Sequence, residues 1–129
     1  MMPTALIIDD NAMNLETLSV LLRKEGVKVV TLSSPANIET FIANQNQLQI
    51  VFLDLEFPNH CGIDLIHKLK QIPELSETPI IAYSVHINEL KEVRRAGFDG
   101  FIGKPLNIEH FPDQLRRILS GEVVWDTDS

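Results

Sequence analysis

The sequence predicts an α/β fold, a doubly wound five-stranded parallel sheet flanked by five helices. Apolar runs without polar alternation recur along the chain, and the clearest, Ile50 to Leu53, stops at Asp54. Such runs are typical of strands buried on both faces of a parallel sheet. Segments with apolar residues at helical spacing separate these runs, and right-handed crossovers leave few topologies. At 129 residues the chain has the size of one domain.

The chain begins with a strand and a helix. Leu6 to Ile8 is a short apolar run that ends at Asp9 and Asp10, and Asn11 can cap the helix that follows. The helix is expected to stop at Gly26, because glycine favours the position after a helix C-terminus. Its apolar stripe consists of Leu15, Leu18 and Leu22.

A second strand and helix precede the central strand. Val27 to Leu32 is rich in valine and reads as a strand. Ser34 and Pro35 are expected to begin the second helix, as its N-cap and its first helical residue, and this helix fades near Asn44. Its inward residues are Ile38, Phe41 and Ile42.

After Asp54, a loop bracketed by Pro58 and Gly62 leads into a helix over Ile63 to Lys70. Ile80 to Tyr83 is the fourth predicted strand, and it ends at Ser84. The inward residues of the helix are Leu65, Ile66 and Leu69.

The last third of the chain repeats the pattern. A helix with a thin stripe of Leu90 and Val93 runs to Gly97, and the short strand Gly100 to Ile102 lies at the sheet edge or ends the sheet. Asn107 can cap a final helix, in which Pro112 predicts a late start or a bend. We expect its inward residues to be Phe111, Leu115, Ile118 and Leu119.

We expect a domain over residues 1–120 and a C-terminal tail over 121–129. The tail contains the lone Trp125, which either frays with the chain end or anchors a contact.

Composition argues against several classes of protein. Apolar residues make up 44% of the chain, no apolar run approaches a membrane span, and the start does not resemble a signal peptide. The single cysteine, Cys61, allows no intrachain disulfide, so a cytoplasmic location fits best. The net charge of −7 argues against nucleic acid as a direct partner. His60 beside Cys61 suggests a metal or redox site, but a transition-metal site needs three or four ligands, so this interpretation is disfavoured.

Basic residues gather on the last two predicted helices despite the acidic total. A solvated face is the simpler interpretation. The functional one is an acidic protein partner, or a homodimer through the fourth helix, fifth strand and fifth helix. The residues are Lys91, Arg94, Arg95, Arg116 and Arg117.

Polar residues end four of the predicted strands, and parallel strands bring their carboxyl ends to one crevice. Three carboxylates there repel one another unless a cation lies among them, and Mg²⁺ prefers oxygen ligands. Asp54 could then attack a phosphoryl group, while Lys104 neutralises its oxygens and Ser84 donates a hydrogen bond to it. The five residues are Asp9, Asp10, Asp54, Ser84 and Lys104.

In their order and setting these residues resemble the receiver domain of response regulators in two-component signalling. The likeness also rests on Leu53-Asp54-Leu55 followed by Pro58 and Gly62, on Ile81 to Ser84, and on Gly103 to Pro105. It implies a flavodoxin-like sheet of strand order 2-1-3-4-5. It further implies Asp54 as phosphoacceptor, with a phosphorylated histidine of a kinase or phosphotransferase as donor.

The resemblance implies further roles. Mg²⁺ would bind Asp9, Asp10, Asp54 and the main-chain oxygen of Glu56. Ser84 and Phe101 would act as the switch that reshapes the face of the fourth helix, fifth strand and fifth helix, although Phe101 could equally be a static core ring. The Lys104–Pro105 bond would be cis. Glu56 and His86 occupy positions that tune the lifetime of the phosphorylated state.

The leading interpretation is a stand-alone receiver that catalyses only its own phosphorylation and dephosphorylation and signals to a protein effector. A pseudo-receiver, an interaction module that works without phosphate, is the main alternative. An enzyme of similar fold, such as an aspartyl phosphatase or a flavin protein, is a third. It is disfavoured because the phosphatase's second acid is missing unless Glu56 supplies it, and there is no glycine-rich dinucleotide loop.

Overall fold

A computed structural model describes residues 3–34, 36–45, 47–55, 62–84, 90–104 and 106–125. Five strands form one parallel sheet in the order β2-β1-β3-β4-β5, which confirms the predicted fold class and strand order. The strands are β1 (Thr4–Ile8), β2 (Lys28–Leu32), β3 (Ile50–Asp54), β4 (Ile80–Ser84) and β5 (Gly100–Gly103).

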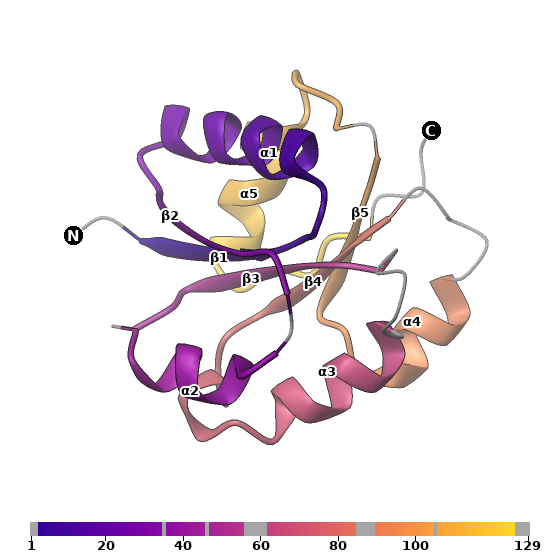
Figure 1. Cartoon of the computed structure of the whole chain (residues 1–129). Helices are drawn as coiled ribbons and strands as arrows, with labels where there is room; N and C mark the ends of the chain where they lie inside the picture. Colours follow the sequence, from indigo (N-terminus) through magenta and orange to yellow (C-terminus); the bar gives the residue numbers. More distant parts are fainter. Residues whose placement is uncertain are drawn as a thin grey trace.

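Helices cover both faces of this sheet (Figure 1). One face carries α1 (Ala12–Lys24) and α5 (Phe111–Leu119). The other face carries α2 (Ile38–Ala43), α3 (Gly62–Lys70) and α4 (Leu90–Ala96), with the short 3₁₀ helix η1 (Pro73–Leu75) after α3. None of the described helices has the length and apolar character needed to span a bilayer.

The packing of the central strand β3 explains why the sequence from Ile50 to Leu53 is apolar at every position. Ile50 and Phe52 pack in the cluster under α1 and α5, whereas Val51 and Leu53 pack in the cluster under α2, α3 and α4. Every residue of the strand is buried. Because both faces are covered, the strand needs apolar residues at each position, and the polar residue comes only at its end.

The first helix begins and ends as predicted. The side-chain oxygen of Asn11 accepts a hydrogen bond from the backbone N–H of Asn14 at 3.0 Å. Gly26 follows the C-cap with a φ of +79°, a left-handed conformation that glycine adopts without steric cost.

The predicted start of the second helix is wrong. The helix begins at Ile38, and its N-cap is Asn37 with a φ of 58° rather than Ser34. The hydroxyl of Ser34 instead accepts the N–H of Ala36 at 3.2 Å, so it closes a local turn ahead of the helix. Serine forms such turns as readily as it caps helices, and asparagine tolerates the left-handed conformation, so the sequence could not separate the two starts. Pro35 lies outside the described residues.

The late start of the final helix is confirmed, because α5 begins at Phe111 with a proline in its first turn. The prediction that Asn107 caps this helix is wrong, because the N-cap is His110. The Asn107 side chain instead accepts the N–H groups of Glu109 and His110 in the turn before the helix. The prediction that Leu119 faces inward is wrong, because this residue is 36% exposed. It lies about 80° around the helix from Phe111, at the margin of the buried stripe.

Candidate functional site

The carboxyl ends of the strands gather the predicted polar residues at one edge of the sheet. Asp9 follows β1, Asp54 ends β3, Ser84 ends β4 and Lys104 follows β5. Asp9, Asp54 and Ser84 are buried, whereas the neighbouring Asp10 is exposed. The predicted cluster therefore exists, and its members differ strongly in their access to water.

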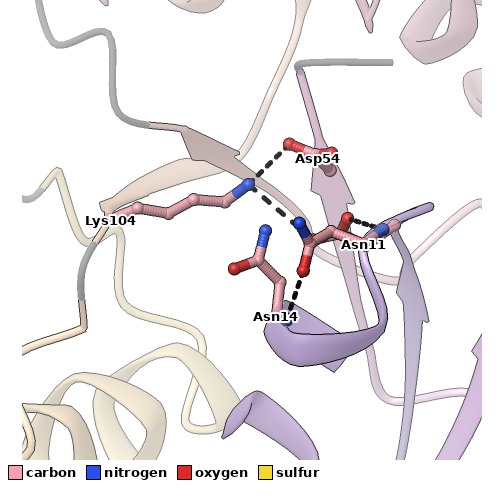
Figure 2. A network of polar contacts seen from close by, with 5 residues as sticks. Asn11, Asn14, Asp54 and Lys104 are labelled. Carbon is pink, nitrogen blue, oxygen red and sulfur yellow. Dashed lines mark hydrogen bonds and ion pairs between the residues drawn. The ribbon is translucent and has the colours of Figure 1, made fainter. Parts of the chain in front are cut away.

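Lys104 is the cation of the cluster. Its amine lies 2.7 Å from Asp54 Oδ1 and 3.7 Å from Asp9 Oδ2, and its side chain is only 8% exposed. Figure 2 shows this side chain reaching from the end of β5 to Asp54. The backbone N–H of Lys104 donates to the Ser84 carbonyl at 2.9 Å, which ties the ends of β4 and β5 together. A buried charge of this kind needs close opposite charges, and the two carboxylates supply them.

Asp9 is the acid of the cluster whose buried charge is least compensated. Its Oδ1 accepts the backbone N–H of Asn11 at 2.8 Å, but its buried Oδ2 has no hydrogen-bond partner within the described part of the chain. Burial raises the pKa of Asp9 from 3.8 to about 6, and the negative charge of Asp54 adds to the rise. The Asn11 N–H and the Lys104 charge oppose it. The carboxylate is thus short of positive charge.

A divalent cation would supply that charge. Oxygens of Asp9, Asp10 and Asp54 all lie within 4.8 Å of one another, close enough to share one ion. Mg²⁺ binds through one or two carboxylates and keeps several waters. The combination of two buried acids with an exposed third one fits such an ion, and the unsatisfied oxygen of Asp9 is the clearest sign of it.

Two contacts at the site were not predicted. The amine of Lys104 lies 4.6 Å from the ring centroid of Tyr83, which is buried, and the Asn11 backbone N–H binds Asp9. The tyrosine could have been suspected, because it is the one residue with a polar tip before the end of an apolar strand. The Asn11 contact depends on the local turn, which residue types do not reveal.

Phe101 lies in β5 opposite Ala82 of β4 and is fully buried. Its ring is therefore already inside the core in this structure. Of the other predicted residues, Glu56, His86 and Pro105 lie outside the described ranges, as do Pro58, His60 and Cys61.

Comparison with known proteins gives a consistent result. A family model described as the response regulator receiver domain matches residues 5–116. Stress response regulator protein 1 of Meyerozyma guilliermondii is 31% identical over 106 residues, which cover 79% of this chain and 49% of that protein. Sensor histidine kinase AruS of Pseudomonas aeruginosa is 34% identical over 123 residues, covering 92% of this chain and 12% of the kinase. The chain thus spans half or less of these two relatives.

Among solved structures, the chemotaxis response regulator CheY4 of Vibrio cholerae superposes with a TM-score of 0.80. It is 21% identical, and the match covers 92% of this chain and 99% of that one. This likeness shows that the two chains share a fold.

Proposed function

The chain belongs to the response regulator receiver domain family of two-component signalling, and from this premise we propose that it accepts a phosphoryl group on Asp54. The observation that carries the proposal is the contact between Asp54 and Lys104 at 2.7 Å, beside a carboxylate with an unsatisfied oxygen. A structural ion pair alone would not need the additional acids of Asp9 and Asp10 at the same place.

The transfer would proceed by attack of an Asp54 carboxylate oxygen on the phosphorus of a phosphohistidine. The new bond is O–P, the broken bond is N–P, and the histidine nitrogen keeps the electron pair of the broken bond. The Lys104 amine, which lies 2.7 Å from Asp54 Oδ1, would stabilise charge on the phosphoryl oxygens. Ser84 ends the neighbouring strand β4, and we expect its hydroxyl to donate a hydrogen bond to the phosphoryl product.

Asp9, Asp10 and Asp54 are the described residues that would hold Mg²⁺. When bound, the ion supplies positive charge that offsets the charge of the incoming phosphoryl group. Asp9 would then lose the penalty that its burial now imposes. The main-chain oxygen of Glu56 is the further ligand that we expect from the resemblance.

The donor we propose is a phosphorylated histidine of a kinase or phosphotransferase, and the output is altered binding of a protein effector. The only reactions that we propose are the phosphorylation and dephosphorylation of the chain itself, in the cytoplasm. Glu56 and His86 are our candidates for setting the lifetime of the phosphoryl group.

Intact-mass measurement after incubation with acetyl phosphate tests the proposal. We expect the wild-type chain to gain the mass of one phosphoryl group with Mg²⁺ and not with EDTA, and Asp54→Asn to gain none. Asp64→Asn is a matched control, because Asp64 lies exposed in the first turn of α3. Absence of any mass gain in the wild type, with a folded protein, would favour the pseudo-receiver instead.

A further inference from the structure

The last described residues cross the face that α4, β5 and α5 build. They begin at the end of α5, where the N–H of Glu122 donates to the Arg117 carbonyl at 2.9 Å. The Glu122 carboxylate also lies 3.4 Å from the Arg117 guanidinium. Residues 122–125, which we call the closing segment, therefore leave α5 in a fixed direction.

The closing segment next reaches β5. The N–H of Phe101 donates to the Val124 carbonyl at 2.9 Å, and Trp125 forms an isolated parallel bridge with Phe101. Because β5 is the edge strand of the sheet, this contact occupies an edge that would otherwise be open to other chains. Val124 is 5% exposed, so the tail forms part of the packed structure here rather than fraying.

The segment ends on α4. The guanidinium of Arg94 lies 4.4 Å from the centroid of the Trp125 ring, a cation–π contact. The indole also packs against the core cluster that contains Phe101 and Val93. The tail thus contacts α5, β5 and α4 in turn, and the alternative in which Trp125 anchors a contact is the one observed.

Gly100 shows how closely this segment packs. A Cβ atom at Gly100 would lie 2.7 Å from the carbonyl oxygen of Val124, a separation that real Cβ atoms do not adopt. The absence of a side chain at this position is therefore what allows the segment to approach β5. A small displacement of β5 relative to the segment would break the Phe101 hydrogen bond.

The contact is also connected to the phosphorylation site. Phe101 and Lys104 lie three residues apart on the same strand and the turn after it, and the Lys104 N–H binds the Ser84 carbonyl. A phosphoryl group on Asp54 would draw both the Lys104 amine and the Ser84 hydroxyl toward it. Phe101 is fully buried, whereas Trp125 at the same face is only partly buried, so moving its ring outward disturbs less of the core.

We propose that the closing segment is a releasable cover on the outer edge of β5, and that phosphorylation of Asp54 favours its release. The second part rests on the proposed function, and the first does not. Release exposes the Phe101 N–H and separates the Arg94 guanidinium from the indole, and an extended segment of a protein effector can join a strand edge of this kind. The covered state keeps that edge from pairing with other chains.

The cover itself is tested without any phosphodonor. Trp125 is the single tryptophan of the chain, so acrylamide quenching of tryptophan fluorescence reports on this contact alone. Gly100→Ala should raise the quenching constant several-fold, and Arg94→Gln should raise it to a smaller extent. Arg95→Gln removes the same charge from an exposed neighbour and should leave it unchanged.

Circular dichroism and thermal melting would establish that each variant is folded. Arg94→Gln places no new atom against the backbone, so it serves as the probe if Gly100→Ala does not fold. Quenching in Arg94→Gln and in any folded Gly100→Ala protein that equals the wild-type value would overturn the cover.

The coupling is tested with beryllium fluoride and Mg²⁺, a phosphoryl mimic. Coupling between sites typically changes an equilibrium by a factor of about five or more, so the ratio of open to closed cover should rise by about that factor in the wild type and not in Asp54→Asn. Acetyl phosphate and intact mass are measured in parallel. A mass gain with unchanged Trp125 quenching under both reagents would overturn the coupling and leave the proposed function intact. No mass gain would remove the proposed function and the coupling, while the Gly100 and Arg94 variants still decide the cover.

Discussion

Asp9 should destabilise the metal-free protein at neutral pH. Its pKa rises from 3.8 to about 6 in the fold, mainly through burial. Well below pH 3.8 the carboxyl is protonated in both the folded and the unfolded chain, and the penalty is absent. As the pH rises through about 6, the unfolded chain has already lost the proton, and the folded chain must ionise a buried acid. Such a shift corresponds to a loss of about 3 kcal/mol in the free energy of unfolding.

Asp9→Asn removes this ionisation and keeps a side-chain oxygen that can accept the Asn11 N–H. We expect the variant to be more stable than the wild type by about 2 kcal/mol in EDTA at neutral pH, because burial of the asparagine amide has a desolvation cost of its own that offsets part of the gain. For a domain of this size the midpoint temperature should rise by roughly 8 °C. Asp10→Asn removes the same charge from an exposed side chain and should change stability by less than about 0.5 kcal/mol.

Urea unfolding in EDTA across the range from about pH 3 to neutral measures the effect. The advantage of Asp9→Asn should appear as the pH rises and be absent at the acidic end. Added Mg²⁺ should stabilise the wild type more than the variant, which narrows the gap. An Asp9→Asn protein no more stable than the wild type at neutral pH in EDTA, or equally favoured at both ends of the range, would refute the reasoning.

Three further substitutions test other parts of the structure. Lys104→Met removes the cation that competes for two carboxylates, so Mg²⁺ should bind more tightly in calorimetric titration. Acetyl phosphate should modify this variant roughly a hundredfold more slowly than the wild type. An unchanged rate of modification would contradict the role of the amine. Asn11→Ala should cost about 1 kcal/mol in urea unfolding through loss of the cap, and Asn14→Ala, which keeps the capped N–H, should cost clearly less. Phe111→Ala should lower the free energy of unfolding by about 3 to 5 kcal/mol, because the ring is fully buried. Leu119→Ala, at the exposed margin of the helix, should lower it by less than about 1 kcal/mol. Similar losses of stability at the two positions would argue against the observed placement of α5.

Some expectations remain predictions because they concern residues outside the described ranges. They include the main-chain ligand and rate-tuning role of Glu56, the role of His86 and the cis bond at Pro105. The basic residues of α4 and α5 are exposed, as the solvated-face interpretation expects, and two of them, Arg94 and Arg117, also contact the closing segment. Whether that face also forms a homodimer is a question for light scattering, with and without the phosphoryl mimic.

The sequence by itself determined the fold and the strand ends at which the described polar residues meet. Apolar runs ending in Asp9, Asp54 and Ser84 identify strands with polar ends, and parallel pairing leaves one edge at which those ends can meet. This inference needs only the period of the pattern and the handedness of the crossovers. The first helix could be bounded in the same way, because Asn11 and Gly26 act through their own local backbone.

The tertiary structure alone decided how the groups at that edge differ and what covers the face beyond it. Nothing in the residue types separates the buried Asp9 from the exposed Asp10, because burial depends on how α1 turns away from β1. The same holds for Val124 and Trp125, whose short run carries no period and becomes ordered only against Gly100 and Arg94, which lie far away along the chain. Local features such as helix caps and polar strand ends depend on neighbouring residues in the sequence. Desolvation and long-range contacts exist only once the chain has folded.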